Sequence, residues 1–145
     1  MDVKNKRVVV TGAASGIGKA LCEAFYQAEA QSVIAVDMNL DGAQETADSV
    51  NGIAIQANVG NEKDIINVIK KADEHVDGTD IFCSNAGIGG VPGFFEVEES
   101  DWQNIWDVNV KSHIFAAKHV LPQMIERGEG YLVTVSYTHL TLPTR

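Results

Sequence analysis

Short apolar runs alternate with longer amphipathic segments along this chain, and the alternation repeats five times. The apolar runs suit strands in the middle of a parallel sheet, and the amphipathic segments place their apolar residues at helical spacing. The predicted strands are 7–10, 32–37, 53–57, 80–84 and 131–135. Strands that alternate with helices form right-handed crossovers and a parallel sheet covered on both faces. The pattern therefore predicts a three-layer, doubly wound α/β fold with strand order 3-2-1-4-5 and a ligand crevice between strands 1 and 4.

The predicted helices follow these strands. The first is expected to bury Ile17, Leu21, Ala24, Phe25 and Ala28, with Gly18 where the helix presses on the sheet. The second spans 41–50, and the third begins at a sequence like a capping box, 61–64. The last starts at a second such sequence, 100–103, and runs to Arg127, with Pro122 expected to bend it.

A glycine-rich stretch, Thr11-Gly12-Ala13-Ala14-Ser15-Gly16-Ile17-Gly18, joins the first strand to the first helix. Such a turn brings backbone N–H groups and the positive end of a helix to one point, where a pyrophosphate binds readily. Glycine supplies the positive φ of the turn and leaves out a Cβ where a ligand meets the backbone. Alone, the stretch also suits a plain turn between strand and helix.

Two further polar residues follow strand ends. Asp37 ends the second strand, 19 positions after Gly18, where a carboxylate can accept hydrogen bonds from ribose hydroxyls. The competing interpretation is a solvated aspartate or a helix cap. Asn58 follows the third strand and could contact an adenine amino group or be an ordinary turn residue.

Length and charge narrow the class of protein. A chain of 145 residues with 45% hydrophobic residues suits one soluble globular domain. Its formal net charge of −9 repels nucleic acid and anionic lipid, so neither is an expected partner.

The positions of the cysteines and histidines do not indicate a metal site. Cys22 and Cys83 each lie within an apolar run, as buried free thiols of a reducing compartment do. No CxxC occurs, and no histidine has metal-ligand spacing with a cysteine. The N-terminus is too polar for a signal peptide and no apolar run has membrane-spanning length, so we expect a cytoplasmic protein.

Four motifs together resemble the short-chain dehydrogenase/reductase family. They are the Thr-Gly-x-x-x-Gly-x-Gly of residues 11–18, Asp37, Asn85-Ala86-Gly87, and Asn109 within Asp-Val-Asn-Val. The glycine spacing is the family's own variant, and the match covers residues 5–136. The resemblance implies an oxidoreductase that moves hydride between a nicotinamide cofactor and an alcohol or carbonyl substrate, assembled as a homodimer or homotetramer.

The resemblance also implies roles for individual residues. Asn109 is similar to an asparagine whose local helix distortion holds a water in the family's proton relay, and Ser136 lies beside the place of the catalytic serine. Asp37 implies NAD rather than NADP, and Asn58 departs from the aspartate often found there. The implied cofactor-binding residues are Gly12, Ala14, Ser15, Gly16, Ile17, Gly18, Asp37, Met38, Asn58, Val59, Asn85, Ala86, Gly87 and Val108.

One part of the family's pattern is missing. The family uses a tyrosine four residues before a lysine for proton transfer, whereas Tyr137 is followed at that spacing by Thr141. We therefore expect an N-terminal fragment that is inactive by itself. A non-catalytic dinucleotide-binding module is the alternative, and a methyltransferase is disfavoured by Asn85-Ala86-Gly87 and Asn109.

The last nine residues, 137–145, depart from the family and have neither helical nor strand periodicity. They resemble translated adapter sequence. The expectation is an incomplete Rossmann domain over residues 1–136 followed by a foreign tail, the alternative being a truncated protein whose own tail covers the sheet edge.

Overall fold

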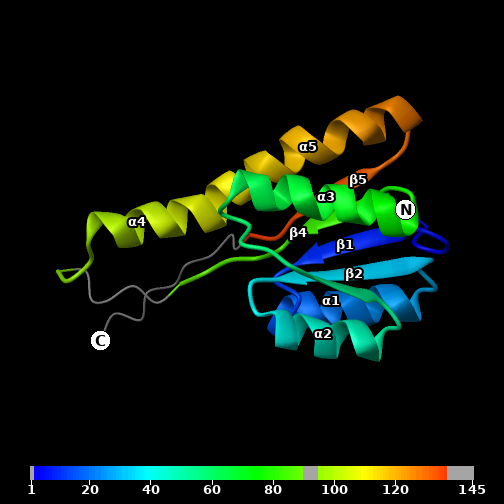
Figure 1. Cartoon of the computed structure of the whole chain (residues 1–145), viewed down its shortest axis with the longest axis horizontal. Helices are drawn as coiled ribbons and strands as arrows, with labels where there is room; N and C mark the ends of the chain where they lie inside the picture. Colours follow the sequence, from blue (N-terminus) through cyan, green and yellow to red (C-terminus); the bar gives the residue numbers. More distant parts are fainter. Residues whose placement is uncertain (1, 90–94, 137–145) are drawn as a thin grey trace.

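A computed structural model describes residues 2–89 and 95–136, and the expectations for Tyr137 and the tail lie outside these ranges. The elements alternate as the pattern predicts (Figure 1). In chain order they are β1 (Arg7–Thr11), α1 (Gly16–Gln27), β2 (Ser32–Asp37), α2 (Leu40–Ser49), β3 (Ile53–Gln56), α3 (Glu62–Val76), β4 (Ile81–Ser84), α4 (Glu99–Trp106), a π-helical turn (Asp107–Lys111), α5 (Ser112–Arg127) and β5 (Tyr131–Thr134).

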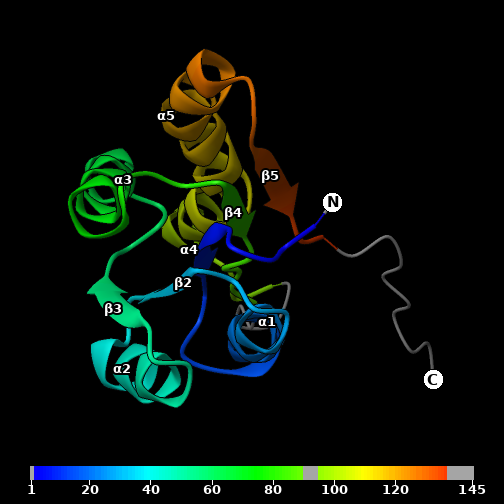
Figure 2. The same ribbon diagram turned by 90° about the vertical axis from the view of Figure 1, so that its right-hand side faces the viewer.

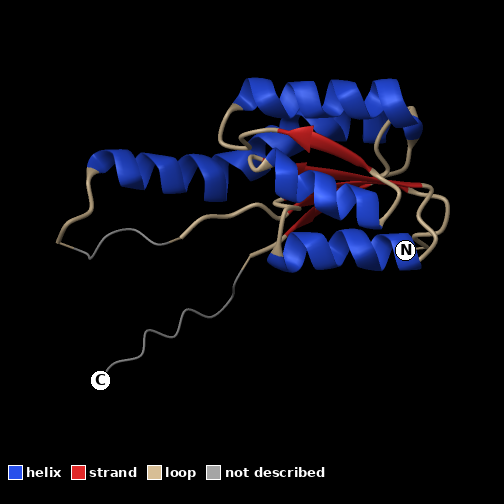
Figure 3. Cartoon of the chain, turned by 60° about the horizontal axis from the view of Figure 1, so that its bottom comes forward, coloured by secondary structure: helices blue, strands red, loops and turns tan. Residues whose placement is uncertain are grey.

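The strands form one parallel sheet in the order β3-β2-β1-β4-β5, which confirms the predicted topology. Helices α1 and α2 cover one face, and α3 and α5 cover the other (Figure 2). Figure 3 shows the same three layers by secondary structure, with α4 extending beyond the end of the sheet. All strand C-termini meet at one edge, where the loops that precede the helices gather.

The apolar side chains of the central strands alternate between two cores. Val9 and Phe82 face the α3 and α5 side, whereas Val8, Val10 and Cys83 face the α1 and α2 side. A strand covered on both faces must be apolar at successive positions, which is why these runs show no alternation of polar residues.

The predicted inward face of α1 is partly wrong. Ile17, Ala24 and Ala28 are exposed, while Gly18 and Cys22 are buried. Leu21 and Phe25 pack against the core from the side, as predicted. The glycine at the centre of the contact face, Gly18, lets the helix approach closely, as predicted.

The predicted long helix at 100–127 is two helices joined by the π-helical turn. Its start is also corrected, because the Asp101 carboxylate accepts a hydrogen bond from the Glu98 backbone N–H at 3.0 Å and the helix begins at Glu99. Pro122 lies inside α5, and the helix ends after Arg127, as predicted, with Gly128 as its C-cap at φ +72°.

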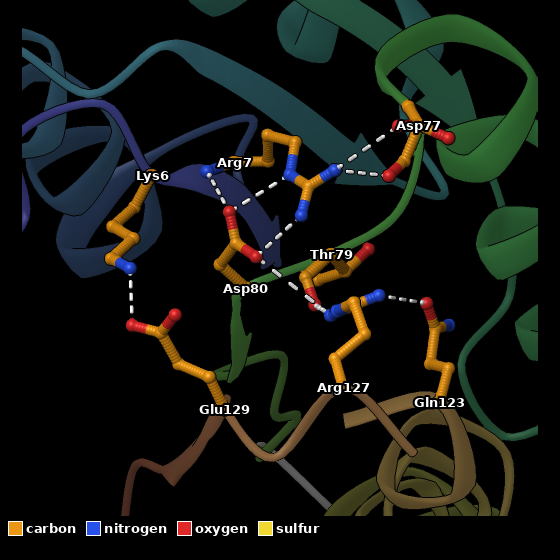
Figure 4. A network of polar contacts seen from close by, with 8 residues as sticks. All are labelled: Lys6, Arg7, Asp77, Thr79, Asp80, Gln123, Arg127 and Glu129. Atoms are coloured by element: carbon orange, nitrogen blue, oxygen red, sulfur yellow. Dashed lines mark hydrogen bonds and ion pairs between the residues drawn. The ribbon is translucent and has the colours of Figure 1, made fainter. Parts of the chain in front are cut away.

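A polar network joins the N-terminal ends of β1 and β4 to the end of α5 (Figure 4). The Arg7 guanidinium donates to both carboxylate oxygens of Asp80, at 2.8 and 2.7 Å, and also bonds the Asp77 carbonyl. Arg127 donates to the Thr79 carbonyl and to Gln123, and Lys6 bonds Glu129. The network lies at the opposite end of the sheet from the glycine turn, which indicates a structural role.

The described helices include none that is both long and apolar enough to cross a membrane. Within the same residues, no group of His, Cys, Asp and Glu side chains could hold a metal ion.

We expect Asp80→Asn to lower the free energy of unfolding by about 3 kcal/mol at neutral pH, because it leaves the Arg7 guanidinium without its carboxylate in a site where both side chains are largely buried. The hydrogen bond from Arg7 lowers the pKa of Asp80 below its usual 3.8. The stabilisation is therefore present above that value and is lost as the pH falls below it. Urea denaturation at several pH values measures both effects. Lys70→Ala, which removes an exposed pair, is the control, and an equal loss in both variants would contradict the prediction.

Candidate functional site

The glycine turn packs directly against the chain that follows β4. Gly12 has φ +71°, and a Cβ on it would lie 2.8 Å from the Ala86 Cα. A Cβ on Gly18 would lie 2.0 Å from the Gly12 carbonyl oxygen. Gly16 has φ +54° and open space where its Cβ would be. Two glycines thus allow close packing, and the third leaves the turn open toward solvent.

Helix α1 begins in this open part of the turn. Its N-cap, Ser15, has extended backbone, and its hydroxyl makes no capping hydrogen bond with any described residue. The first turn of α1 carries no acidic side chain. The positive end of the helix is therefore not neutralised locally, and this cradle fits a phosphate group.

The Asp37 carboxylate is held by two backbone N–H groups at the end of β2. One oxygen accepts from Ala14 at 3.0 Å and the other from Asn39 at 2.9 Å. Each carboxylate oxygen can accept further hydrogen bonds, so the group is oriented without being saturated. Asp37 thus stands beside the glycine turn with a defined direction.

Thr11 joins the end of β1 to the residues after β4. Its buried hydroxyl donates to the Cys83 carbonyl at 3.2 Å and accepts from the N–H groups of Asn85 and Ala86 at 3.0 and 3.1 Å. The Asn85 amide returns a hydrogen bond to the Thr11 carbonyl at 2.9 Å. The Asn85-Ala86-Gly87 segment is therefore fixed as one wall of the site.

Asn109 lies in the π-helical turn, so the expected local distortion of the helix is present. Its side chain pairs with the backbone of Ile88, accepting from the N–H and donating to the carbonyl, both at 2.8 Å. This pair ties the wall to the helix that covers it.

His113 supports the same wall and was missed by the sequence analysis. Its Nδ1 lies 2.7 Å from the buried Ser84 hydroxyl. Burial lowers the pKa of His113 below its usual 6.5, which favours the neutral ring at pH 7. The sequence feature that could have pointed to His113 is its position four residues after Asn109, on the same face of the helix.

A pocket of about 170 Å³ lies at the C-terminal ends of the strands. It is lined by Gly12, Asp37, Met38, Ala57, Asn58, Val59, Ala86, Gly87, Ile88, Asn104 and Val108. Ala57, Ile88 and Asn104 were not predicted, and Asn104 could not be, because only the path of α4 brings it there.

Most of the other predicted residues are not among those that line this pocket. Ala14, Ser15, Gly16 and Ile17 form the turn and the start of α1, and Gly18 is buried beneath the turn. Asn85 belongs to the wall, and Ser136 is exposed beyond the end of β5. Asn58 accepts from the Gly60 N–H at 3.0 Å, so the turn role considered for it is present while it also lines the pocket.

The two cysteines are free and buried, as predicted. Burial raises the pKa of each thiol to about 12. Both therefore stay protonated and take no part in the site.

Comparison with known proteins places this geometry in a family. The short chain dehydrogenase family matches residues 6–141. The chain belongs to the short-chain dehydrogenase/reductase family. It is 32% identical to glucose 1-dehydrogenase 2 of Bacillus subtilis (strain 168) over 98% of this chain and 58% of that protein. It is 33% identical to the 3-oxoacyl-(acyl-carrier-protein) reductase FabG of Vibrio cholerae, over 93% of this chain and 56% of that protein.

A solved member of the short-chain dehydrogenase/reductase family has the same fold. The crystal structure of hydroxysteroid dehydrogenase from Escherichia coli superposes with a TM-score of 0.85 at 28% sequence identity, over 93% of this chain and 57% of that one. The chain thus spans a little over half the length of these relatives.

We expect Gly18→Ala to disrupt the glycine turn, because the added methyl group meets the Gly12 carbonyl oxygen at 2.0 Å and the turn or helix must move. Overpacking of this kind costs about 1–3 kcal/mol of unfolding free energy, measured by urea denaturation. Gly89→Ala is the control, since a Cβ there meets no described atom within 4 Å. Equal stability of the two variants would contradict the packing role of Gly18.

Proposed function

We propose that this chain is the cofactor-binding part of an oxidoreductase that transfers hydride between NAD and an alcohol or carbonyl substrate. The observation that carries the proposal is that Gly12 of the glycine turn and the oriented Asp37 carboxylate line one pocket, while the same turn leads into the uncapped start of α1. Family membership supports the reaction type.

The residues divide the proposed site into three parts. The turn from Gly12 to Gly16 would hold the pyrophosphate, and Asp37 the adenosine ribose. Asn85-Ala86-Gly87 would line the nicotinamide side. When bound, the nicotinamide supplies the hydride acceptor or donor. Asn109 would hold a water of the proton relay through the distorted turn, and Ser136 would stand near the substrate oxygen.

Asp37 favours NAD over NADP in this proposal. A ribose 2′-phosphate beside its carboxylate would place like charges at about 4 Å, which costs about 4 kcal/mol at an effective dielectric of about 20, before screening. No cation of the described residues is bonded to Asp37, whose recorded partners are the two backbone N–H groups. NADP is therefore the less favoured cofactor.

We expect the protein expressed from its complete gene to bind NAD⁺ at least about tenfold more tightly than NADP⁺, measured by calorimetry. Asp37→Asn removes the charge at nearly constant shape and should bring the two dissociation constants toward each other. Asp41→Asn, an exposed carboxylate in the first turn of α2, is the control with the same charge change. Equal or tighter binding of NADP⁺ by the unaltered protein would contradict the preference.

A non-catalytic dinucleotide-binding module remains the second candidate. It does not require a Tyr-x-x-x-Lys pair, and Tyr137 with Thr141 does not form one. The sequence encoded beyond Ser136 and an assay of turnover distinguish the two candidates. A Tyr-x-x-x-Lys sequence beyond Ser136, together with reduction of NAD⁺ in the presence of an alcohol, supports the enzyme. Binding of NAD⁺ without that sequence and without turnover supports the module.

We also propose a homodimer or homotetramer assembled through α4 and α5. These helices expose Trp102 (50%), Trp106 (54%), Ile114 (55%) and Ile125 (76%). Large apolar side chains gathered on one helical unit mark an interface more often than a solvated surface. The buried free thiols fit a reducing compartment, so the proposed location is the cytoplasm.

We expect Trp106→Glu in the protein from its complete gene to shift the molar mass by light scattering from an oligomer to a monomer, because a carboxylate would be buried in the interface. Ile66→Glu, on the exposed side of α3, should leave the mass unchanged. A monomeric unaltered protein would rule out this assembly.

A further inference from the structure

Helix α2 contacts the glycine turn at Ala13 and Ala14. Thr46 of α2 is fully buried, and its hydroxyl donates to the Ala13 carbonyl at 2.8 Å. The same hydroxyl lies 3.1 Å from the Gly42 carbonyl one helical turn earlier, the ordinary partner of a helical threonine. The shorter bond runs out of the helix, to the turn.

Two further contacts hold the same part of the turn. The Ala13 N–H donates to the Val36 carbonyl at 3.1 Å, and the Ala14 N–H donates to Asp37. Helix α2 also comes close enough that a Cβ on Gly42 would lie 2.8 Å from the Ala14 Cβ. The polar groups of Ala13 are thus bound to β2 and α2.

The Ala13 carbonyl has a particular need for this partner. Ala13 is completely buried, so its carbonyl oxygen has little access to water if the hydroxyl is removed. An unpaired buried carbonyl is costly, and the backbone relieves that cost by rotating. Ala13 lies between Gly12, which lines the pocket, and Ala14, which bonds Asp37, so rotation there moves both.

We propose that Thr46 is a positioning residue for dinucleotide binding, which acts through the Ala13 carbonyl to set the shape of the glycine turn. The proposal rests on the proposed function, because it assumes that the turn binds the pyrophosphate. Thr46 is not one of the residues that line the pocket, so it affects the ligand only through the turn.

The chain offers a matched pair of threonines for the test. Thr79 is as fully buried as Thr46, but its hydroxyl has no hydrogen-bond partner among the described residues. Thr46→Val and Thr79→Val therefore make the same chemical change, and only the first removes a bond to the turn. Thr46→Ser keeps the hydroxyl and serves as the rescue variant.

The experiment measures the dissociation constant of NAD⁺ by calorimetry on the protein from its complete gene, well below the melting temperature of each variant. Loss of one buried hydrogen bond predicts an increase of about fivefold for Thr46→Val. Thr46→Ser should stay within about twofold of the unaltered protein, and Thr79→Val should be unchanged. Gly42→Ala, which pushes on Ala14 from the same side, should also weaken binding and replaces Thr46→Val if that variant does not fold.

The melting temperature without ligand separates positioning from simple stabilisation. A lower melting temperature for Thr46→Val with an unchanged dissociation constant would overturn the positioning role and leave the proposed function intact. An unaltered protein that binds neither NAD⁺ nor NADP⁺ would overturn the proposed function itself. Weaker binding by Thr46→Val that Thr46→Ser restores is the supporting result.

Discussion

The close approach of the glycine turn to the end of β4 is the constraint on which the site depends. Gly12 lies where any Cβ would meet the Ala86 backbone, and Thr11 binds the two segments together through its hydroxyl. Because β1 and β4 are adjacent parallel strands, this contact lies where the order of strands reverses. A larger residue at Gly12 would push the glycine turn away from Ala86 and distort the pocket even when no ligand is bound.

Both helical layers hold the site, from opposite sides. On one face, Thr46 and Asp37 bind the turn through Ala13 and Ala14. On the other, Asn109 binds Ile88 and His113 binds Ser84. These are the residues on either side of the Asn85-Ala86-Gly87 wall, and Ser84 is the last residue of β4. Because hydrogen bonds within the protein hold these segments, the pocket is largely formed before a ligand binds. Less conformational entropy is then lost on binding.

Stability and binding use different ends of the same sheet. The Arg7 and Asp80 network closes the N-terminal ends of the strands, and the pocket opens at the C-terminal ends. The positive end of α1 also gives an acidic protein, with a net charge of −9, a local site where an anion is favoured. The start of α1 therefore favours a phosphate at this place, although the protein as a whole is negatively charged.

The sequence by itself determined the strand order, the layers and the position of the pocket, because apolar runs, glycine spacing and strand-end residues are local signals of a parallel α/β fold. It determined only part of the inward face of α1, since Gly18 and Cys22 are buried as predicted whereas Ile17, Ala24 and Ala28 are exposed. Apolar residues at helical spacing do not by themselves show which side of a helix meets the sheet. Nor could it assign partners to Thr46, His113 and Asn104, whose roles arise only when elements distant along the chain are packed together. Local chemistry sets which elements form, but hydrogen bonds between layers depend on the distances that the tertiary structure creates.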